Sequence, residues 1–334
     1  MNRLENTRIM KNQTFGVEIE MSRISREKVA MTVCKYFREK YSTTTPYYTF
    51  VGGSYDKWIA TDNKGREWKM VSDASVQGGV NSCELVTPIL KYEDIEDLQE
   101  IVRVLRGLGA KSNADYGCGV HIHVGVQDMD GGSHNPHTLR NLLNIVNSHQ
   151  NILAKAIGFT MSRTDYCDFI SSELVRKMNA EKPRTMTDLQ FLHYRTLVSY
   201  VNTWQDVLDE SREHYSGSRY YFLNLHAVWY RGTVEFRCFE FHKNMHAGEL
   251  KAYIQLCLAM SNYAKMVAYA NPREIAVTNE KFSMKNWLVN MGMTGDEFKT
   301  ARKMLMKRLT GDPAYLNARE HVVAPNTLDD LGLE

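Results

Sequence analysis

The sequence has 334 residues, 43% hydrophobic and 24% charged, which is typical of a folded globular protein and excludes a disordered chain. Its 41 basic and 39 acidic residues nearly cancel, so the net charge does not indicate nucleic acid or a membrane as a partner. The six cysteines are scattered without a C-x-x-C pair, the first residues lack an apolar signal core, and no apolar run approaches the ~20 residues of a membrane helix. We therefore expect reduced thiols and a cytoplasmic location.

Strand-like and helix-like periods follow one another from Thr14 to about Val267 without an obvious linker. In the first half, alternating or apolar runs predict strands over residues 14–22, 82–90 and 117–126, and a hairpin over 57–71 that turns at 63–65. Apolar residues at helical spacing predict helices over 25–41, which Ser25 can cap, and over 92–109, which Gly109 ends.

The second half of the chain is richer in helical patterns. Helices are predicted over 137–158, over a polar stretch from 171 to about 213, and over 249–270, with a strand hairpin over 220–242 that turns near 230–232. A smaller helical unit with a helix over 294–309 should follow, and the tail beyond about Ala318 is expected to fray. Strands that form hairpins or return through helices favour an α+β fold. We expect a main domain over 14–270 and a C-terminal helical extension with a tail over 271–334.

Four of the strand-like segments place charged residues on one face of each strand. Side chains at positions i and i+2 of a strand point to the same side of the sheet. The residues that share such a face are Glu18 and Glu20 in GVEIE, Glu84 in CELVTP, His121 and His123 in GVHIHVG, and Glu235 and Arg237 in GTVEFRCFE. A solvated face would explain any one pair, but solvated faces usually carry Lys, Thr, Ser and Gln, and these segments contain no lysine.

The acidic character of this face predicts a metal site. Carboxylates gathered on one concave face would repel one another and raise each other's pKa unless a cation held them ionised. Oxygen ligands with an imidazole suit Mg²⁺ or Mn²⁺ better than Zn²⁺, and so many ligands could hold more than one ion. Several carboxylates around Mg²⁺, beside an arginine and a further histidine, are typical of sites for a nucleotide polyphosphate such as ATP. No Walker loop, nucleophile elbow or zincin motif is present.

The order of these motifs resembles that of the amidoligase family. The motifs are FGVEIE, DASV followed by CELVTPIL, GVHIHVG, and RYYFLNLHA followed by GTVEFRCFE, and they span roughly residues 14–270. The family is similar to glutamine synthetase and glutamate-cysteine ligase, which are carboxylate-amine ligases. The resemblance implies a glutamine synthetase-like antiparallel sheet that is curved into a half-funnel and flanked by helices, with ATP and two or three divalent ions on its concave face.

The resemblance also implies a role for each motif residue. Metal ions would be bound by Glu18, Glu20, Glu84, His121 and Glu235. His123 would reach an ATP phosphate, and Arg237 would stabilise the transferring phosphoryl group.

Further residues are assigned less directly by the same resemblance. Asp73 and Ser75 lie where the family binds substrate, although Ala74 replaces the usual glycine between them. Arg219 and Asn224 would contact nucleotide or carboxylate, and residues 163–167 resemble a segment near the acceptor site.

The implied reaction has two steps. ATP phosphorylates a substrate carboxylate, and an amine then displaces phosphate from the acyl phosphate to leave an amide. The partners would be carboxylate-bearing and amine-bearing small molecules or peptides, and an oligomer is compatible with the sequence. Candidates for the general base are Asp73, Asp115 and Glu240. The same sheet could instead support a phosphotransferase similar to guanidino kinases, a metal-dependent hydrolase, or a non-catalytic binding module.

Overall fold

An eight-stranded sheet runs through the computed structural model, which describes residues 3–52, 56–127, 133–160, 163–164 and 166–316. In the order in which they lie side by side, the strands are β2 (Tyr48–Gly52), β3 (Lys57–Thr61), β4 (Glu67–Val71), β5 (Ser82–Val86), β1 (Phe15–Ser22), β6 (Val120–Gly125), β8 (Thr233–Phe239) and β7 (Leu223–Asn224). Every strand pairing in the described part of this sheet is antiparallel, which confirms the expected combination of helices with an antiparallel sheet.

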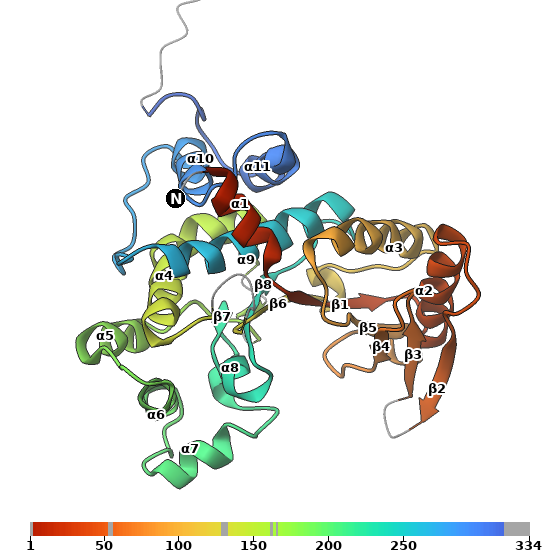
Figure 1. Ribbon diagram of the computed structural model, residues 1–334, viewed down its shortest axis with the longest axis horizontal. Coiled ribbons are helices and arrows are strands. Elements are labelled where there is room, and N and C mark those ends of the chain that lie inside the picture. The colour runs from red at the N-terminus through yellow and green to blue at the C-terminus, as the bar shows by residue number, and fades with distance from the viewer. Residues whose placement is uncertain (1–2, 53–55, 128–132, 161–162, 165, 317–334) are drawn as a thin grey trace, which may run out of the picture.

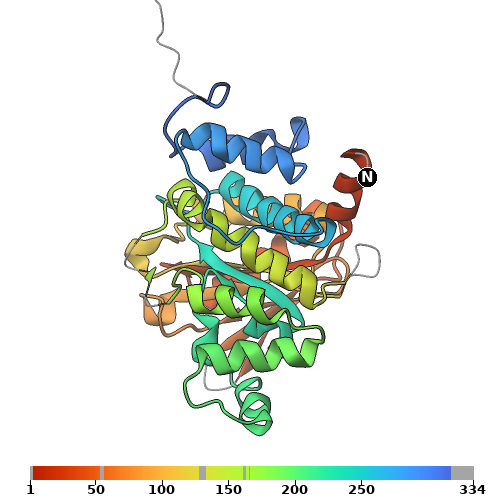
Figure 2. The ribbon, with the colours of Figure 1, turned by 90° about the vertical axis from the view of Figure 1, so that its left-hand side faces the viewer.

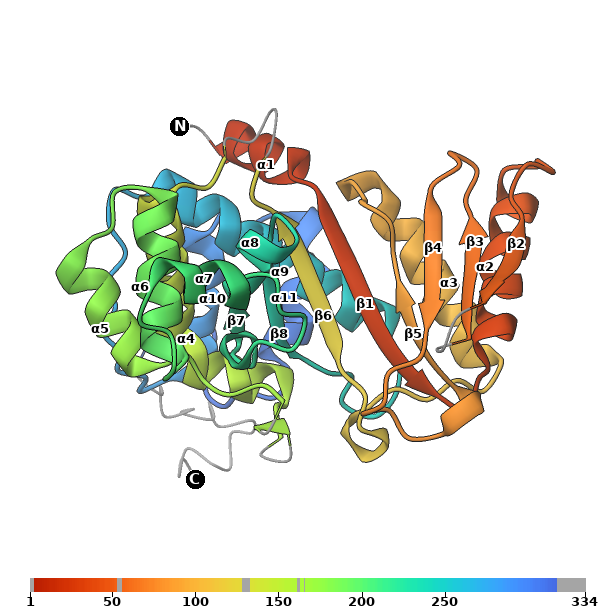
Figure 3. The same cartoon turned by 90° about the horizontal axis from the view of Figure 1, so that it is seen from below.

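In chain order the helices are α1 (Arg3–Asn12), α2 (Arg26–Lys40), α3 (Ile95–Gly107), α4 (Pro136–Ile157), α5 (Ser172–Glu181), α6 (Met186–Leu197), α7 (Trp204–Glu210), α8 (His226–Tyr230), α9 (Ala247–Met266), α10 (Glu280–Asn290) and α11 (Lys299–Met306). Helices α3 and α9 lie on one side of this sheet, whereas α6, α7 and α8 lie on the other side near its β7–β8 edge, as Figures 1 and 3 show. Helix α2 contacts β3 and β4, and α9 contacts β6. Seen from below, β1 and β6 lie in front of α9, so their near face is turned away from it (Figure 3).

The two central strands owe their two faces to period-two alternation. On β1 the apolar residues Val17, Ile19 and Met21 belong to the buried core, and the alternate positions carry the carboxylates Glu18 and Glu20. On β6 the same pattern separates the core residues at 120, 122 and 124 from the histidines at 121 and 123. The helix-covered face is therefore apolar, and the opposite face is charged although it is also buried.

The predicted hairpin over 220–242 is wrong in its first half. β7 has only two residues, and His226–Tyr230 forms the short helix α8 before β8 begins at Thr233. The run HAVWY is apolar without a clear period of two, so its pattern cannot separate a strand from a short buried helix. The turn at Arg231 and Gly232 is present, and Gly232 has a φ of +72°, where glycine is favoured over other residues.

The predicted helical stretch over 171–213 consists of the three helices α5, α6 and α7. Each begins at a hydroxyl cap, because the side chains of Ser171, Thr185 and Thr203 accept hydrogen bonds from the first turns of α5, α6 and α7.

The prediction did not include α1 or the edge strand β2, and it placed both ends of α9 a few residues too late. The sequence did not predict β2 because its residues are largely exposed on both faces and show no alternation of apolar and polar residues.

The C-terminal helices share the core of the rest of the molecule. α11 contacts α9 and α4, and residues of α10 and α11 belong to the same apolar cluster as the sheet (Figure 2, blue helices beside α9 in cyan). The ring of Trp287 on α10 stacks on His149 of α4 with 4.2 Å between centroids. The predicted fraying tail beyond Ala318 lies outside the described residues, and the boundary at residue 270 remains a prediction.

All six cysteines are buried free thiols. None of the helices within the described residues combines the length and the apolar character that crossing a membrane requires. The helices instead carry apolar residues along one side, as in globular proteins. In α2 these residues are Val29, Val33 and Phe37, which are buried.

Asp94 ties the β3–β4 hairpin to the start of α3, and its replacement gives a first prediction. Its buried carboxylate lies 2.7 and 3.0 Å from two nitrogens of Arg66 and 2.8 Å from Lys64 Nζ. Burial would raise the pKa of Asp94, but these two cations and the Lys91 N–H lower it to about 2. Because this pKa is below the value of about 3.9 in the unfolded chain, the ionised form stabilises the fold above about pH 4.

Asp94→Asn should therefore lower the free energy of unfolding by roughly 1–3 kcal/mol at pH 7. Denaturant titrations of both proteins at several pH values should show this difference shrinking as the pH falls from about 4 toward 2. Glu96→Gln, at an exposed position in the same helical turn, should change stability by less than about 0.5 kcal/mol. A difference that is absent at pH 7, or that is constant across this range, would contradict the assignment.

Candidate active site

Four neighbouring strands carry the charged residues on one face of the sheet. These residues are Glu84 on β5, Glu18 and Glu20 on β1, His121 and His123 on β6, and Glu235 and Arg237 on β8. The strand register sets three pairs directly opposite each other: Glu20 with Glu84, Glu18 with His121, and His123 with Glu235. Residues that are far apart in the chain thus form one continuous cluster.

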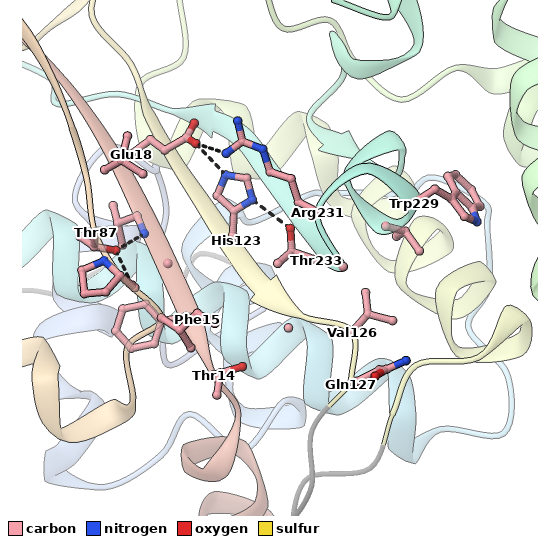
Figure 4. A pocket seen from close by; sticks show the side chains of 18 of the residues that line it. Thr14, Phe15, Glu18, Thr87, His123, Val126, Gln127, Trp229, Arg231 and Thr233 are labelled. Atoms are coloured by element: carbon pink, nitrogen blue, oxygen red, sulfur yellow. Dashed lines mark hydrogen bonds and ion pairs between the residues drawn. The ribbon is translucent and has the colours of Figure 1, made fainter. Parts of the chain in front are cut away.

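Glu18 lies at the centre of this cluster. Its Oε2 is 3.2 Å from His121 Nδ1, and its Oε1 is 3.5 Å from His123 Nε2 and 2.6 Å from Arg231 Nη1 (Figure 4). Burial would raise the pKa of Glu18, but His123, His121 and Arg231 together hold it well below its usual range. The central carboxylate is therefore ionised and surrounded by positive or donor groups.

Glu235 and Arg237 form a second part of the cluster. Glu235 accepts hydrogen bonds from Arg237 Nη1 at 2.6 Å and from Asn224 Nδ2 at 2.7 Å. Burial would raise the pKa of Glu235, but Arg237 and His123 lower it to about 2. β8 has one more residue than β6 between their paired positions beside Arg237, which is a β-bulge of the kind often found next to active sites. The guanidinium is thereby fixed at one point of the charged face.

A third part of the cluster brings Glu20, Glu84 and Asp73 together. Glu20 Oε2 accepts a hydrogen bond from Gly119 N at 2.6 Å, and Asp73 Oδ1 accepts from the backbone N and the hydroxyl of Ser75 at 2.7 and 2.6 Å. Burial and the negative charges of Glu18, Glu20 and Asp73 raise the pKa of Glu84 well above its usual value. Such a group of like charges needs a cation to keep all of its members ionised.

These residues fit divalent ions. Three sets of ligands each have one ligand atom per residue within 4.8 Å of the others: Glu18, His123 and Glu235; Glu18, Glu84 and His121; and Glu20, Asp73 and Glu84. Seven of these nine places are taken by carboxylates and two by imidazoles, a donor set that suits Mg²⁺ or Mn²⁺. Asp73, which the sequence assigned to substrate, lies in one of these sets.

Arg163 and Glu240 lie beside the Glu20 end of the cluster. Arg163 is buried against Gly119 so closely that a Cβ there would lie 2.8 Å from Cζ of the guanidinium, which only glycine avoids. Within the described residues its side chain makes no hydrogen bond or ion pair, and its Nε is buried without a partner. Glu240 is likewise buried, with Oε2 unpartnered. Burial raises the pKa of Glu240, although Arg163 opposes this shift.

A cavity of about 580 Å³ opens at the other end of the cluster (Figure 4). Its walls come from the first residues of β1, the end of β6, and the α8–β8 turn, and they include Phe15, Glu18, His123, Trp229, Arg231 and Thr233. His123 Nδ1 lies 3.0 Å from Thr233 Oγ1, which fixes the ring with Nε2 toward Glu18. The cavity is thus partly apolar and meets the charged cluster at Glu18 and His123.

The structure brings most of the predicted site residues together. The five predicted metal ligands, His123, Arg237, Asn224 and Asp73 all belong to the cluster described above. Arg219 makes no hydrogen bond with the cluster among the described residues: its guanidinium donates to the His214 carbonyl and lies over the rings of Tyr215 and Tyr220. The ring of Tyr220 also lies under Arg237, so Arg219 is next to the cluster and its role stays a prediction. Asp115, a candidate base, instead accepts a hydrogen bond from Asn113.

Two contributing residues were missed by the sequence prediction. Arg231 lies in the turn before β8, outside the predicted strand pattern, whereas Thr233 begins β8 and shares the face of Glu235 and Arg237 by the same period of two. The signal for Thr233 was its place in GTVEFR, two residues before Glu235, and the signal for Arg231 was its position immediately before that motif.

The chain is similar to one family of known proteins and, more distantly, to a solved structure. Residues 11–261 match the family model described as "Putative amidoligase enzyme". The search of curated proteins found no match. Among solved structures, a bifunctional glutathione synthetase from Pasteurella multocida is similar at 13% sequence identity and a TM-score of 0.41, over 92% of this chain and 48% of that one. This chain therefore spans about half the length of that synthetase.

Proposed function

Because the chain belongs to the amidoligase family, we propose that it joins a carboxylate to an amine in an ATP-dependent reaction that requires Mg²⁺ and proceeds through an acyl phosphate. The observation that carries the proposal is the cluster of five carboxylates, two histidines and Arg237 on one sheet face, with three candidate sets of ion ligands. Ligase chemistry of this type must neutralise a polyphosphate and then an acyl phosphate, and the cluster supplies suitable groups.

We further propose that the sheet has the curved form of the glutamine synthetase catalytic fold. An open antiparallel sheet, with α3 and α9 on one side and a charged cluster on the other face of its central strands, supports this assignment. In such an arrangement the cavity at the Glu18 end would receive the nucleotide, because its Ile89 and Trp229 offer apolar contacts to a base and it borders His123.

Each group of the cluster has a task in this proposal. Two or three Mg²⁺ ions, held by the three sets of ligands, would neutralise the phosphates. Arg237, whose Nη1 is fixed by Glu235 at 2.6 Å, would present its remaining N–H groups to the transferring phosphoryl group. His123, fixed through Thr233, would donate from Nε2 to a phosphate oxygen.

The carboxylate substrate would enter from the other end of the cluster. Arg163 is a buried cation that makes no hydrogen bond or ion pair within the described chain, although Glu240 is near it, so an anion supplied by a ligand would stabilise it. A substrate carboxylate is the anion that the proposed reaction provides. Of the three candidate bases, Glu240 suits the role of general base best. It is beside Arg163, and its Oε2 has no hydrogen-bond partner and could accept the amine proton.

The test is a condensation assay with Mg-ATP and pools of amino acids, polyamines and peptides. A ligase should release ADP and phosphate and form a product lighter by one water than the sum of two substrates. With an ¹⁸O-labelled carboxylate, one label should appear in phosphate. Phosphate release without a condensed product would indicate a hydrolase, and a phosphorylated product would indicate a phosphotransferase. Either result would overturn the proposal, and reactions with EDTA serve as the blank.

A further inference from the structure

Arg231 lies between the charged cluster and the cavity. It follows α8 in the turn before β8, and its Nη1 donates to Glu18 Oε1 at 2.6 Å. Its side chain is 38% exposed, whereas that of Glu18 is 7% exposed. Within the described residues this is the one hydrogen bond of its guanidinium, beside a ring contact with Tyr230 at 5.8 Å. Arg231 is thus joined to the site through a single carboxylate oxygen.

This contact competes with a metal ion. Glu18 belongs to two of the three sets of candidate ligands, so its oxygens should face an ion when the site is loaded. Oε1 instead faces Arg231, and Oε2 faces His121. A guanidinium at hydrogen-bond distance and a divalent ion on the same oxygen would repel each other strongly in this buried site. Ion binding at Glu18 must therefore weaken or displace the Arg231 contact.

The cavity offers the displaced guanidinium no other protein anion. Among the described residues that line it, Glu18 is the sole carboxylate. The side chain is held neither by burial nor by a second hydrogen bond, and Gly232 follows it in the turn. An anionic ligand in the cavity would consequently be the next partner within reach.

We infer that Arg231 is an exchangeable counter-ion that couples metal binding to nucleotide binding. It neutralises Glu18 when no ion is bound, and it transfers to the nucleotide phosphates when a divalent ion takes its place. Each ligand then favours the other, because the ion frees the guanidinium and the phosphates hold it away from Glu18. The inference rests on the proposed use of ATP and Mg²⁺, and it goes beyond that proposal by assigning a cooperative step to a residue outside the ligand sets.

The test measures Mn²⁺ affinity by calorimetric titration, with and without a non-hydrolysable ATP analogue. Without nucleotide, Arg231→Ala should bind Mn²⁺ about fivefold more tightly than the wild type, because no internal cation competes. With nucleotide this advantage should disappear, so the coupling factor between the two ligands should fall by at least about fivefold. Arg231→Lys, which keeps the charge, should stay near the wild type. Arg212→Ala, which removes an exposed arginine that the sequence does not place in the site, controls for net charge.

The outcomes distinguish a failure of the counter-ion role from a failure of the proposed function. If wild-type protein binds both ligands but Arg231→Ala matches Arg212→Ala, the counter-ion role is wrong and the proposed function stands. If Mn²⁺ affinity rises but the coupling persists, the transfer to phosphate is wrong. If wild-type protein binds neither Mn²⁺ nor the nucleotide analogue, the proposed function itself fails. Melting temperatures of all variants verify that each is folded, and the exposed position of Arg231 makes this the expected result.

Discussion

Arg237→Ala should lower the turnover of the condensation reaction by about 10³-fold or more. The expected loss is large because Arg237 is the buried cation of β8 that Glu235 fixes within the cluster, and no other arginine on these four strands could replace it among the described residues. Product formation under saturating Mg-ATP measures the effect. Far-ultraviolet circular dichroism should remain that of the wild type, because the core on the opposite face of β8 is untouched.

The melting temperature of Arg237→Ala and the behaviour of Arg237→Lys provide two further checks of this prediction. Without Arg237, Glu235 keeps Asn224 as a partner but loses its nearest cation, so the melting temperature should fall by several degrees. Arg237→Lys retains a charge but not the planar fork, and it should recover part of the stability with little of the turnover. A variant without Arg237 that turns over at near the wild-type rate would disprove its assigned role.

Glu20→Gln should reduce turnover by about 10²-fold or more and weaken Mg²⁺ binding. The amide oxygen can still accept the Gly119 N–H, so the substitution removes one negative charge from the set of Glu20, Asp73 and Glu84 with little change of shape. The same charge loss relieves repulsion that raises the pKa of Glu84. In EDTA the variant should therefore melt at or above the wild-type temperature, whereas added Mg²⁺ should stabilise it less.

Paired melting curves in EDTA and in Mg²⁺ would measure both effects together. Glu67→Gln, on the exposed side of β4, removes a carboxylate from the same sheet and should leave turnover and the Mg²⁺ response unchanged. An Mg²⁺-dependent rise in melting temperature that is equal in Glu20→Gln and wild type would show that Glu20 does not bind the ion.

The shared faces of the strands were predictable because they depend on local geometry alone. Once residues 15–22 and 120–125 form strands, the period of two places Glu18 with Glu20 and His121 with His123. Which residues lie opposite one another was not predictable, since the register of Glu20 against Glu84 depends on distant chain segments and on their connections. The bulge beside Arg237 is a further property of pairing that no single strand contains.

Asp73 and Arg231, which the sequence misplaced or missed, lie outside regular strands. Asp73 follows β4 in a loop, and its approach to Glu20 depends on how that loop folds back. Arg231 reaches Glu18 on β1 from the turn before β8, across the intervening strand β6. Side chains on turns and loops have no periodicity that reveals their direction, so their membership in the site required the three-dimensional structure.

The order of the strands has a consequence for how this protein matures. The candidate ion ligands come from segments at residues 18–20, 73–84, 121–123 and 235, so they span more than 200 positions of the chain. Long-range pairing of this kind forms late, because distant segments must first find each other. A nascent chain from which β8 has not yet emerged would lack Glu235 and Arg237. His123 would then have Glu18 but not Thr233 as a contact. Ion affinity at the set of Glu18, His123 and Glu235 should therefore arise only with the finished sheet, whereas the other two sets need no residue of β8. Ion binding at that one set is thus a reporter of complete folding rather than a step that initiates it.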